Sequence, residues 1–153
     1  MTRIGIISDT HDVLRPEAVK ALEGSEIIIH AGDIGGPEIL DRLKILAPVY
    51  AVRGNMDGSP GGDSLPVTDI IEISGKLLYV LHNIAEIDLD PVAAGLAVVI
   101  SGHSHRPHIA HKNGVLFINP GSAGPRRFSL PVTVASLKIV GDSINCDIIE
   151  LRV

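Results

Sequence analysis

Residues 4–11 read Ile-Gly-Ile-Ile-Ser-Asp-Thr-His, an apolar run that ends in two residues able to bind a metal ion, Asp9 and His11. Five further potential ligands follow later apolar runs: Asp33, Asn55, His82, His103 and His105. A parallel α/β sheet gathers the carboxyl ends of its strands along one edge, so these seven side chains can converge there. Carboxylate, amide and imidazole donors in one crevice are the ligands that a pair of divalent cations needs.

The composition predicts one domain, residues 1–153, built mainly from aliphatic residues. A chain of 153 residues can bury a sufficient core without disulfides. Hydrophobic residues make up 45% of the chain but aromatics only 3%, which suits strands that are buried on both faces. The single Cys146 cannot form an internal disulfide, which is consistent with a reducing cytosol, and we interpret it as a small buried hydrophobe.

The sequence also limits the partners that we expect. The N-terminus lacks the apolar stretch and cleavage site of a signal peptide, and no apolar run approaches the roughly 18 residues of a membrane span. We therefore expect a cytoplasmic protein that does not enter membranes. A net charge of −5 argues against broad nucleic-acid binding, but bound cations would still allow a small anionic substrate.

The first third of the chain predicts a β-α-β-α-β unit with parallel strands. Strands are expected at 4–8, 26–30 and 49–52, with helices from Pro16 to about Glu23 and from Pro37 to Pro48.

Later segments are mostly strands. Ser74-Gly75 predicts a hairpin between 69–73 and 76–81, followed by a brief helix at 90–94 and a buried strand at 97–100. The segments 107–111, 115–118, 132–139 and 143–151 are typical of antiparallel strands. Two sheets packed face to face, with helices outside, is the architecture we expect.

Each potential ligand also has an ordinary structural interpretation. Asp9 and Asp33 could cap helices, Asn55 could form a turn, and a lone histidine such as His82 is more often structural than a ligand. His30 is better interpreted as a satisfied core histidine than as a ligand. A buried strand, a glycine and then His103-x-His105 form the most specific piece, because a solvated turn rarely carries that pair.

Other catalytic motifs do not fit. The sequence contains no P-loop, and the residues around Ser122 lack the spacing of a nucleophile elbow. A structural zinc site would need more than one cysteine.

In this order and spacing, the motifs resemble those of the calcineurin-like metallophosphoesterases, and more closely their short bacterial and archaeal phosphodiesterase branch. The pattern D-x-H, G-D, G-N-x-D, H and G-H-x-H covers positions 9 to 105, and Asn119-Pro120-Gly121-Ser122 extends the likeness. The resemblance implies a four-layer α/β/β/α sandwich of two mixed β-sheets and a dinuclear site, with manganese expected first and iron, nickel or zinc as alternatives.

The resemblance also assigns roles to residues. Asp9, His11 and His105 would hold one metal, Asn55, His82 and His103 the other, and Asp33 would bridge them. Asp33, Asn55, Asp57 and His103 would serve catalysis, and the Asn55 amide would also contact the phosphate.

The implied function is metal-dependent hydrolysis of small phosphodiesters, with a hydroxide bridging the two metals as the nucleophile. Two alternatives stay open: phosphomonoester hydrolysis, or a catalytically poor protein-binding scaffold such as the family's retromer subunit. Self-association of the chain is a further expectation from the family.

Two positions depart from the family pattern. Met56 stands where many larger relatives carry a histidine that can protonate the leaving group, and Asn83 stands where glycine is usual after His82. Substrate contacts are expected from the loops 12–15, 56–65 and 121–130. Arg126 and Arg127 are candidate anion contacts, and a solvated pair is the alternative.

Overall fold

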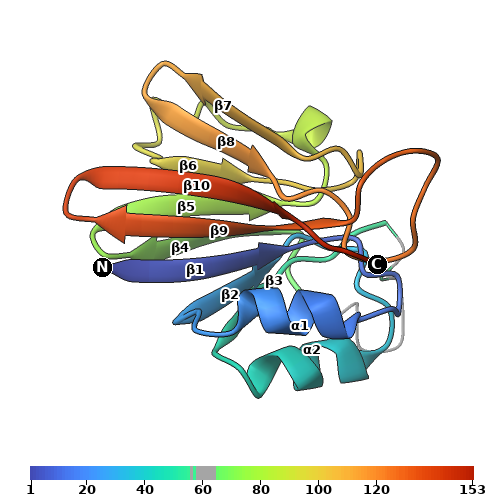
Figure 1. Cartoon of the computed structure of the whole chain (residues 1–153). Coiled ribbons are helices and arrows are strands. Elements are labelled where there is room, and N and C mark those ends of the chain that lie inside the picture. The colour runs from blue at the N-terminus through green and yellow to red at the C-terminus, as the bar shows by residue number, and fades with distance from the viewer. Residues whose placement is uncertain (56, 58–64) are drawn as a thin grey trace.

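In a computed structural model of the chain, which describes residues 1–55, 57 and 65–153, ten strands form two five-stranded sheets (Figure 1). The strand order is β10-β9-β1-β2-β3 in the first sheet and β4-β5-β6-β8-β7 in the second. Within the described ranges no helix is long and apolar enough to cross a membrane.

The first sheet combines the two ends of the chain. Its elements from the first third are β1 (Thr2–Ile7), α1 (Pro16–Leu22), β2 (Ile27–His30), α2 (Pro37–Lys44) and β3 (Val49–Ala51). These three strands are parallel, which confirms the predicted β-α-β-α-β unit. On its other side β1 pairs antiparallel with β9 (Thr133–Val140), which forms a hairpin with β10 (Ser143–Glu150).

The second sheet contains β4 (Thr68–Ile73), β5 (Lys76–Leu81), β6 (Val98–Ile100), β7 (His108–Lys112) and β8 (Val115–Asn119). The predicted β4–β5 hairpin is confirmed. The prediction of purely antiparallel pairing after residue 107 is wrong, because β8 lies parallel to β6 and antiparallel only to β7. The more apolar β8 takes the inner position and leaves the polar β7 at the edge of the sheet.

The main core lies between the two sheets and is aliphatic, as predicted. Ile4, Ile29, Val80 and Ile118 are among the residues buried there. Both α1 and α2 cover the outer face of the first sheet (Figure 1). The outer face of the second sheet carries a thinner layer, which includes the short 3₁₀ helix η2 (Ile84–Glu86).

Two smaller predictions have different outcomes. The segment 90–94 forms hydrogen-bonded turns and not a helix, because Gly95, with a φ of 73°, ends it after one turn. Cys146 lies half-buried in β10, and burial raises the pKa of its thiol to about 12. The thiol is therefore unreactive, in agreement with its interpretation as a small hydrophobe.

Candidate metal centre

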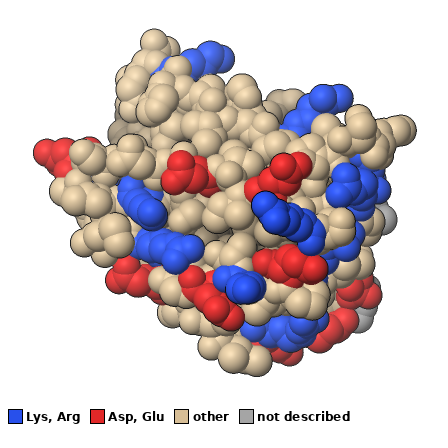
Figure 2. All heavy atoms as spheres, in the orientation of Figure 1, with Lys and Arg blue, Asp and Glu red and all other residues tan. Residues whose placement is uncertain are grey.

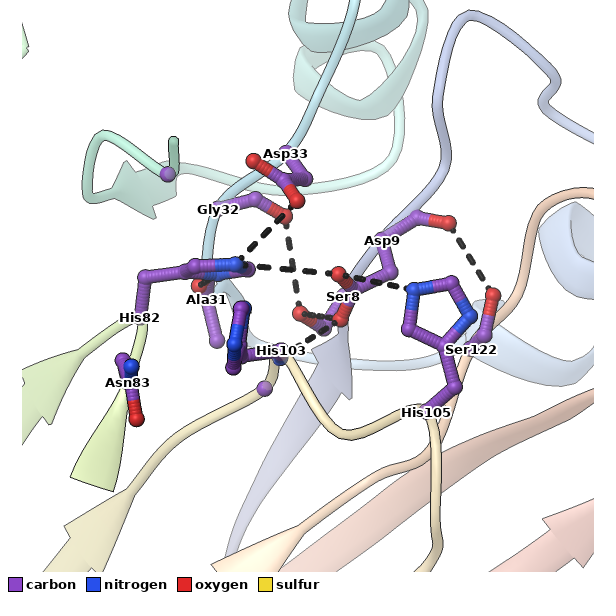
Figure 3. Close-up of polar contacts among 12 residues, drawn as sticks. Ser8, Asp9, Ala31, Gly32, Asp33, His82, Asn83, His103, His105 and Ser122 are labelled. Carbon is purple, nitrogen blue, oxygen red and sulfur yellow. Dashed lines mark hydrogen bonds and ion pairs between the residues drawn. The ribbon is translucent and has the colours of Figure 1, made fainter. Parts of the chain in front are cut away.

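The loops that follow β1, β2, β5 and β6 bring the predicted ligands together at one edge of the molecule. Asp9, Asp33, His82, His103 and His105 gather there (Figure 3). Backbone hydrogen bonds hold the first two loops side by side, since the N–H of Asp9 donates to Gly32 O and the N–H of His11 donates to Asp33 O, each at 3.0 Å. As the parallel strands predict, Asp9, His11, Asp33, His82 and His105 offer ligand atoms that lie close together.

Asp9 is the centre of this cluster and is fully buried. Its Oδ2 accepts hydrogen bonds from Ser8 Oγ (2.7 Å) and from the N–H of His103 (3.1 Å). Its Oδ1 has no hydrogen-bond partner among the described residues. Instead, Oδ1 faces the Nε2 atoms of His11, His82 and His105 at 3.7, 3.8 and 3.4 Å.

Asp33 supplies the second carboxylate and is also buried. Its Oδ2 lies 3.2 Å from His82 Nε2 and 3.7 Å from His11 Nε2. Two sets of donor atoms, each within 4.8 Å of one another, result: Asp9 with His11 and His105, and Asp9 with Asp33 and His82. The first set has the same members as the first metal site implied by the family pattern.

In the neutral form of His82, Nε2 keeps a lone pair that faces the two carboxylates and could bind a metal ion. Its Nδ1 lies 2.8 Å from Ala31 O, a carbonyl that can only accept, so Nδ1 carries the proton. This is the arrangement in which a backbone carbonyl orients a metal-binding histidine. Burial lowers the pKa of His82, but the Asp33 carboxylate, the Ala31 carbonyl and Asp9 outweigh it and leave this pKa above its ordinary value.

His30 lies behind the centre and joins its first two loops. Its Nδ1 accepts the N–H of Gly32 (3.1 Å), so Nε2 carries the proton and donates to Thr10 Oγ1 (3.0 Å), which donates to Ile34 O (2.7 Å). Complete burial lowers the pKa of His30 to about 3, so the ring is neutral. The interpretation of His30 as a satisfied core histidine is confirmed.

His105 is buried and lies on the side of Asp9 that faces away from His82 (Figure 3). Burial lowers its pKa, and the cationic Arg127 acts in the same direction, so the ring stays neutral near pH 7. Imidazole nitrogens and carboxylate oxygens face one another in this cluster, and both are ligands that divalent cations accept. The donor set therefore fits divalent metal ions of the transition series.

The backbone of these loops is itself unusual. Five of the seven predicted ligands have positive φ: Asp9, His11, Asp33, His103 and His105, with values from 45° to 72°. Such conformations cost about 1–3 kcal/mol each outside glycine and cluster at functional sites. At Gly102 even a β-carbon would lie 2.7 Å from Asp9 Oδ2, so only glycine lets this loop approach Asp9.

The remaining predicted site residues lie around this cluster. His103 is exposed, with its ring 5.2 Å from that of His82. Asn55 is exposed and, with Arg53 and His82, lines a cavity of about 390 Å³. His103 does not belong to the two compact sets of His and Asp donors. Arg127 lies close enough to act on His105.

Asp57, expected to serve catalysis, is buried and bound to backbone. Its Oδ1 accepts the N–H groups of Ile34 (2.9 Å) and Gly35 (3.3 Å), and its Oδ2 accepts that of Gly54 (2.9 Å). These bonds join the loop of Asp33 to the loop of Asn55. Met56 and most of the predicted contact loop 56–65 lie outside the described residues.

Sequence analysis missed several polar residues that support the centre. Ser122 Oγ donates to Asp9 O at 3.1 Å, and Asn119 Nδ2 donates to Gly102 O at 2.9 Å and to Ser104 Oγ at 3.1 Å. Asn119 and Ser122 belong to the Asn-Pro-Gly-Ser segment, which was the available signal.

Comparisons with known proteins agree with this geometry. Residues 2–142 match the calcineurin-like phosphoesterase superfamily domain. A probable metallophosphoesterase of Methanothermobacter thermautotrophicus is 37% identical, over 96% of this chain and 91% of its own. A phosphodiesterase of Methanocaldococcus jannaschii is 33% identical, over 78% of this chain and 82% of its own.

Solved structures show the same fold. A structure described as a novel archaeal phosphodiesterase superposes with a TM-score of 0.80 at 25% identity, over 97% of this chain and all of its own. Vps29 of Chaetomium thermophilum superposes with a TM-score of 0.85 at 20% identity, over 99% of this chain and 88% of its own.

Proposed function

Because the chain belongs to the calcineurin-like phosphoesterase superfamily, we propose that it hydrolyses small phosphodiesters with two divalent metal ions. The observation that carries this proposal is the environment of Asp9 Oδ1. This fully buried oxygen makes no hydrogen bond within the described residues and faces three imidazole nitrogens at 3.4–3.8 Å. A site of this kind is unfavourable without a cation.

Asp9, His11 and His105 would hold one ion, and Asn55, His82 and His103 the other, with Asp33 shared between them. When bound, two divalent cations would supply a bridging hydroxide near neutral pH and positive charge beside the phosphate. We propose manganese first, with iron, nickel or zinc as alternatives.

The chain's own residues would prepare this chemistry. The Ala31 carbonyl fixes the tautomer of His82, and the N–H of His103 with Ser8 fixes the carboxylate of Asp9. Only Asp9 and Asp33 contribute negative charge, which is less than two divalent ions would bring, so the loaded site would attract a phosphate anion. Asn55 and Arg127 would help to bind it.

The preference for diesters is supported by the relatives described as phosphodiesterases, from Methanocaldococcus jannaschii and in the archaeal structure. A scaffold role is the alternative, since Vps29 also occurs as a complex with a cyclic peptide. Retention of all seven ligand positions in this chain favours the enzyme. A cytosolic location is part of the proposal, because Cys146 has no disulfide partner in the chain.

One assay separates these functions. The protein is stripped of metal, Mn²⁺ is added back, and hydrolysis of bis(p-nitrophenyl) phosphate is followed beside p-nitrophenyl phosphate. We expect activity only with metal and a higher kcat/KM for the diester. A faster monoester reaction would indicate a phosphomonoesterase, and full metal occupancy without activity on either ester would indicate a scaffold.

A further inference from the structure

A second, larger cavity lies on the outer face of the second sheet, outside the cluster of metal ligands. Its volume is about 850 Å³, within the range of small-molecule sites. We call it the β7–β8 groove. The residues that line it are Ile84, Ser101, Ser104, Arg106, Pro107, His108, Ala110, His111, Lys112, Phe117, Ile118, Asn119 and Leu130.

The floor of the groove is apolar. Ala110 on β7 is paired with Phe117 on β8, and Phe117 packs against the outer cluster of the second sheet. Ile84 of η2 is 40% exposed and contributes a second apolar surface, and Leu130 contributes a third. A small residue beside an aromatic ring leaves room for a flat apolar group.

The rim is cationic. Lys112 lies on the same face of β7 as Ala110, because side chains alternate along a strand, and Arg106 precedes the strand. Among the described residues no Asp or Glu lines the groove, although acidic residues outnumber Lys and Arg by 18 to 13 in the chain. Neither Arg106 nor Lys112 forms an ion pair within the part of the chain that the structure describes.

The distribution of surface charge agrees with a cationic rim. On the face drawn in Figure 2, acidic and basic side chains are interspersed over most of the surface. The uppermost part, where β7 and β8 lie in Figure 1, shows Lys or Arg but no Asp or Glu.

One end of the groove is built by the loops that carry the metal ligands. Ser104 lies between His103 and His105, and Ile84 follows His82 by two residues. Because Ser104 and Ile84 line the groove and are sequence neighbours of these histidines, the groove begins beside the candidate metal centre. At that centre the rings of His82 and His103 are 5.2 Å apart. Asn119 donates to Ser104 Oγ and fixes this junction.

We infer that the β7–β8 groove receives one ester substituent of the substrate, and that this substituent is an apolar, aromatic group with its own negative charge. The inference rests on the proposed function and narrows it to diesters with an anionic aromatic substituent. The floor would hold the ring by burial of apolar surface, and Arg106 with Lys112 would select the negative charge.

Binding to the groove can be measured without metal and without catalysis. The probe is anilinonaphthalene sulfonate, an aromatic anion, titrated into the full-length metal-free protein and followed by its fluorescence. Phenylnaphthylamine, which lacks the sulfonate, is the uncharged counterpart. We expect one saturable site that prefers the anion.

The variant that tests the rim is Arg106→Glu with Lys112→Glu. It should weaken binding of the anion about tenfold or more but leave binding of the uncharged probe within about twofold, since only the charged contacts change. The matched control is Arg42→Glu with Lys20→Glu, the same change of charge on exposed positions of α2 and α1. Circular dichroism of each variant verifies that it is folded.

Equal weakening in the control, or equal affinity for both probes in the unmodified protein, would overturn the inference. In the metal-loaded protein the anionic probe should raise KM for bis(p-nitrophenyl) phosphate and leave kcat unchanged. If the probe binds without any change in KM, the groove is not part of the substrate site, and this result would also overturn the inference. Absence of hydrolysis with every diester would instead refute the proposed function, whatever the outcome of the metal-free titration.

Discussion

Replacing Asp57 by asparagine tests whether this residue acts through the backbone or in the chemistry. The carboxylate is buried and accepts three backbone N–H groups, two at Oδ1 and one at Oδ2. Asparagine keeps one oxygen for Ile34 and Gly35, but it places an amide NH₂ against the N–H of Gly54. One charge-assisted hydrogen bond is lost and a donor loses its partner.

The magnitude follows from these three bonds. An unsatisfied buried N–H costs about 1–3 kcal/mol, and loss of the charge weakens the two remaining bonds by roughly 0.5 kcal/mol each. We therefore expect Asp57→Asn to lower the free energy of unfolding by about 3 kcal/mol. For a chain of this size the melting temperature should fall by about 6–12 °C.

Urea unfolding of the metal-free protein measures this loss. Asp90→Asn is the matched control: Asp90 Oδ1 also accepts two backbone N–H groups, at 3.0 and 3.4 Å, but the side chain is exposed. It should change the unfolding free energy by no more than about 0.5 kcal/mol. If Asp57→Asn were as stable as the unmodified protein and yet inactive, Asp57 would belong to the reaction and the reasoning would be refuted.

Four further predictions concern the centre and its surroundings. Asp33→Asn should lower Mn²⁺ affinity, measured calorimetrically, and kcat by about tenfold or more each, because it removes the carboxylate that we propose is shared by two ions. The free energy of unfolding should fall as the pH drops from about 6.5 toward 3, because His30 (pKa about 3) stays neutral in the folded protein while the unfolded chain binds a proton; His30→Gln should flatten this part of the curve. Gly102→Ala should cost about 1–3 kcal/mol of stability and weaken metal binding, since its β-carbon would approach Asp9 Oδ2 to 2.7 Å. Diesters with good leaving groups should react much faster than alkyl esters, because Met56 cannot donate a proton, as rates across a series of leaving-group pKa values would reveal.

Each of these predictions has an outcome that contradicts it. Unchanged activity in Asp33→Asn would remove the shared role of this carboxylate. An unfolding free energy that is flat below pH 6.5 would contradict the neutral state of His30. Normal metal binding in Gly102→Ala would show that the loop can retreat from Asp9, and equal rates across the leaving-group series would point to another proton donor.

The parts of the fold that could be predicted are those in which burial determines the sequence. The isoleucine-rich strands β1 and β2 are buried from both sides, and Pro16 and Pro37 mark the helix starts, so both features were visible. The position of β8 between β6 and β7 could not be predicted, because strand order depends on which segment gains more by burial. That comparison involves the whole sheet and leaves no local pattern.

At the candidate site, too, local sequence patterns predicted some features and contacts between distant segments determined the others. The candidate ligands could be singled out because donors recur at the ends of strands, but the grouping of Asp9 with two different sets of donors depends on distances across four loops. The three hydrogen bonds of Asp57 likewise join segments that are up to 23 residues apart in sequence and that share no common pattern. The left-handed backbone of the ligand residues leaves only a weak trace in sequence, because aspartate and histidine tolerate it without glycine.

The pairing of β1 with both β2 and β9 has a consequence for biosynthesis. β1 ends just before Asp9, and one of its two neighbours is made more than 120 residues later, since β9 spans Thr133–Val140. The strand that supports Asp9 therefore gains its second neighbour late in folding, because segments so far apart in sequence pair slowly. We therefore expect the candidate metal centre to be completed only after β9 has been made and has paired with β1.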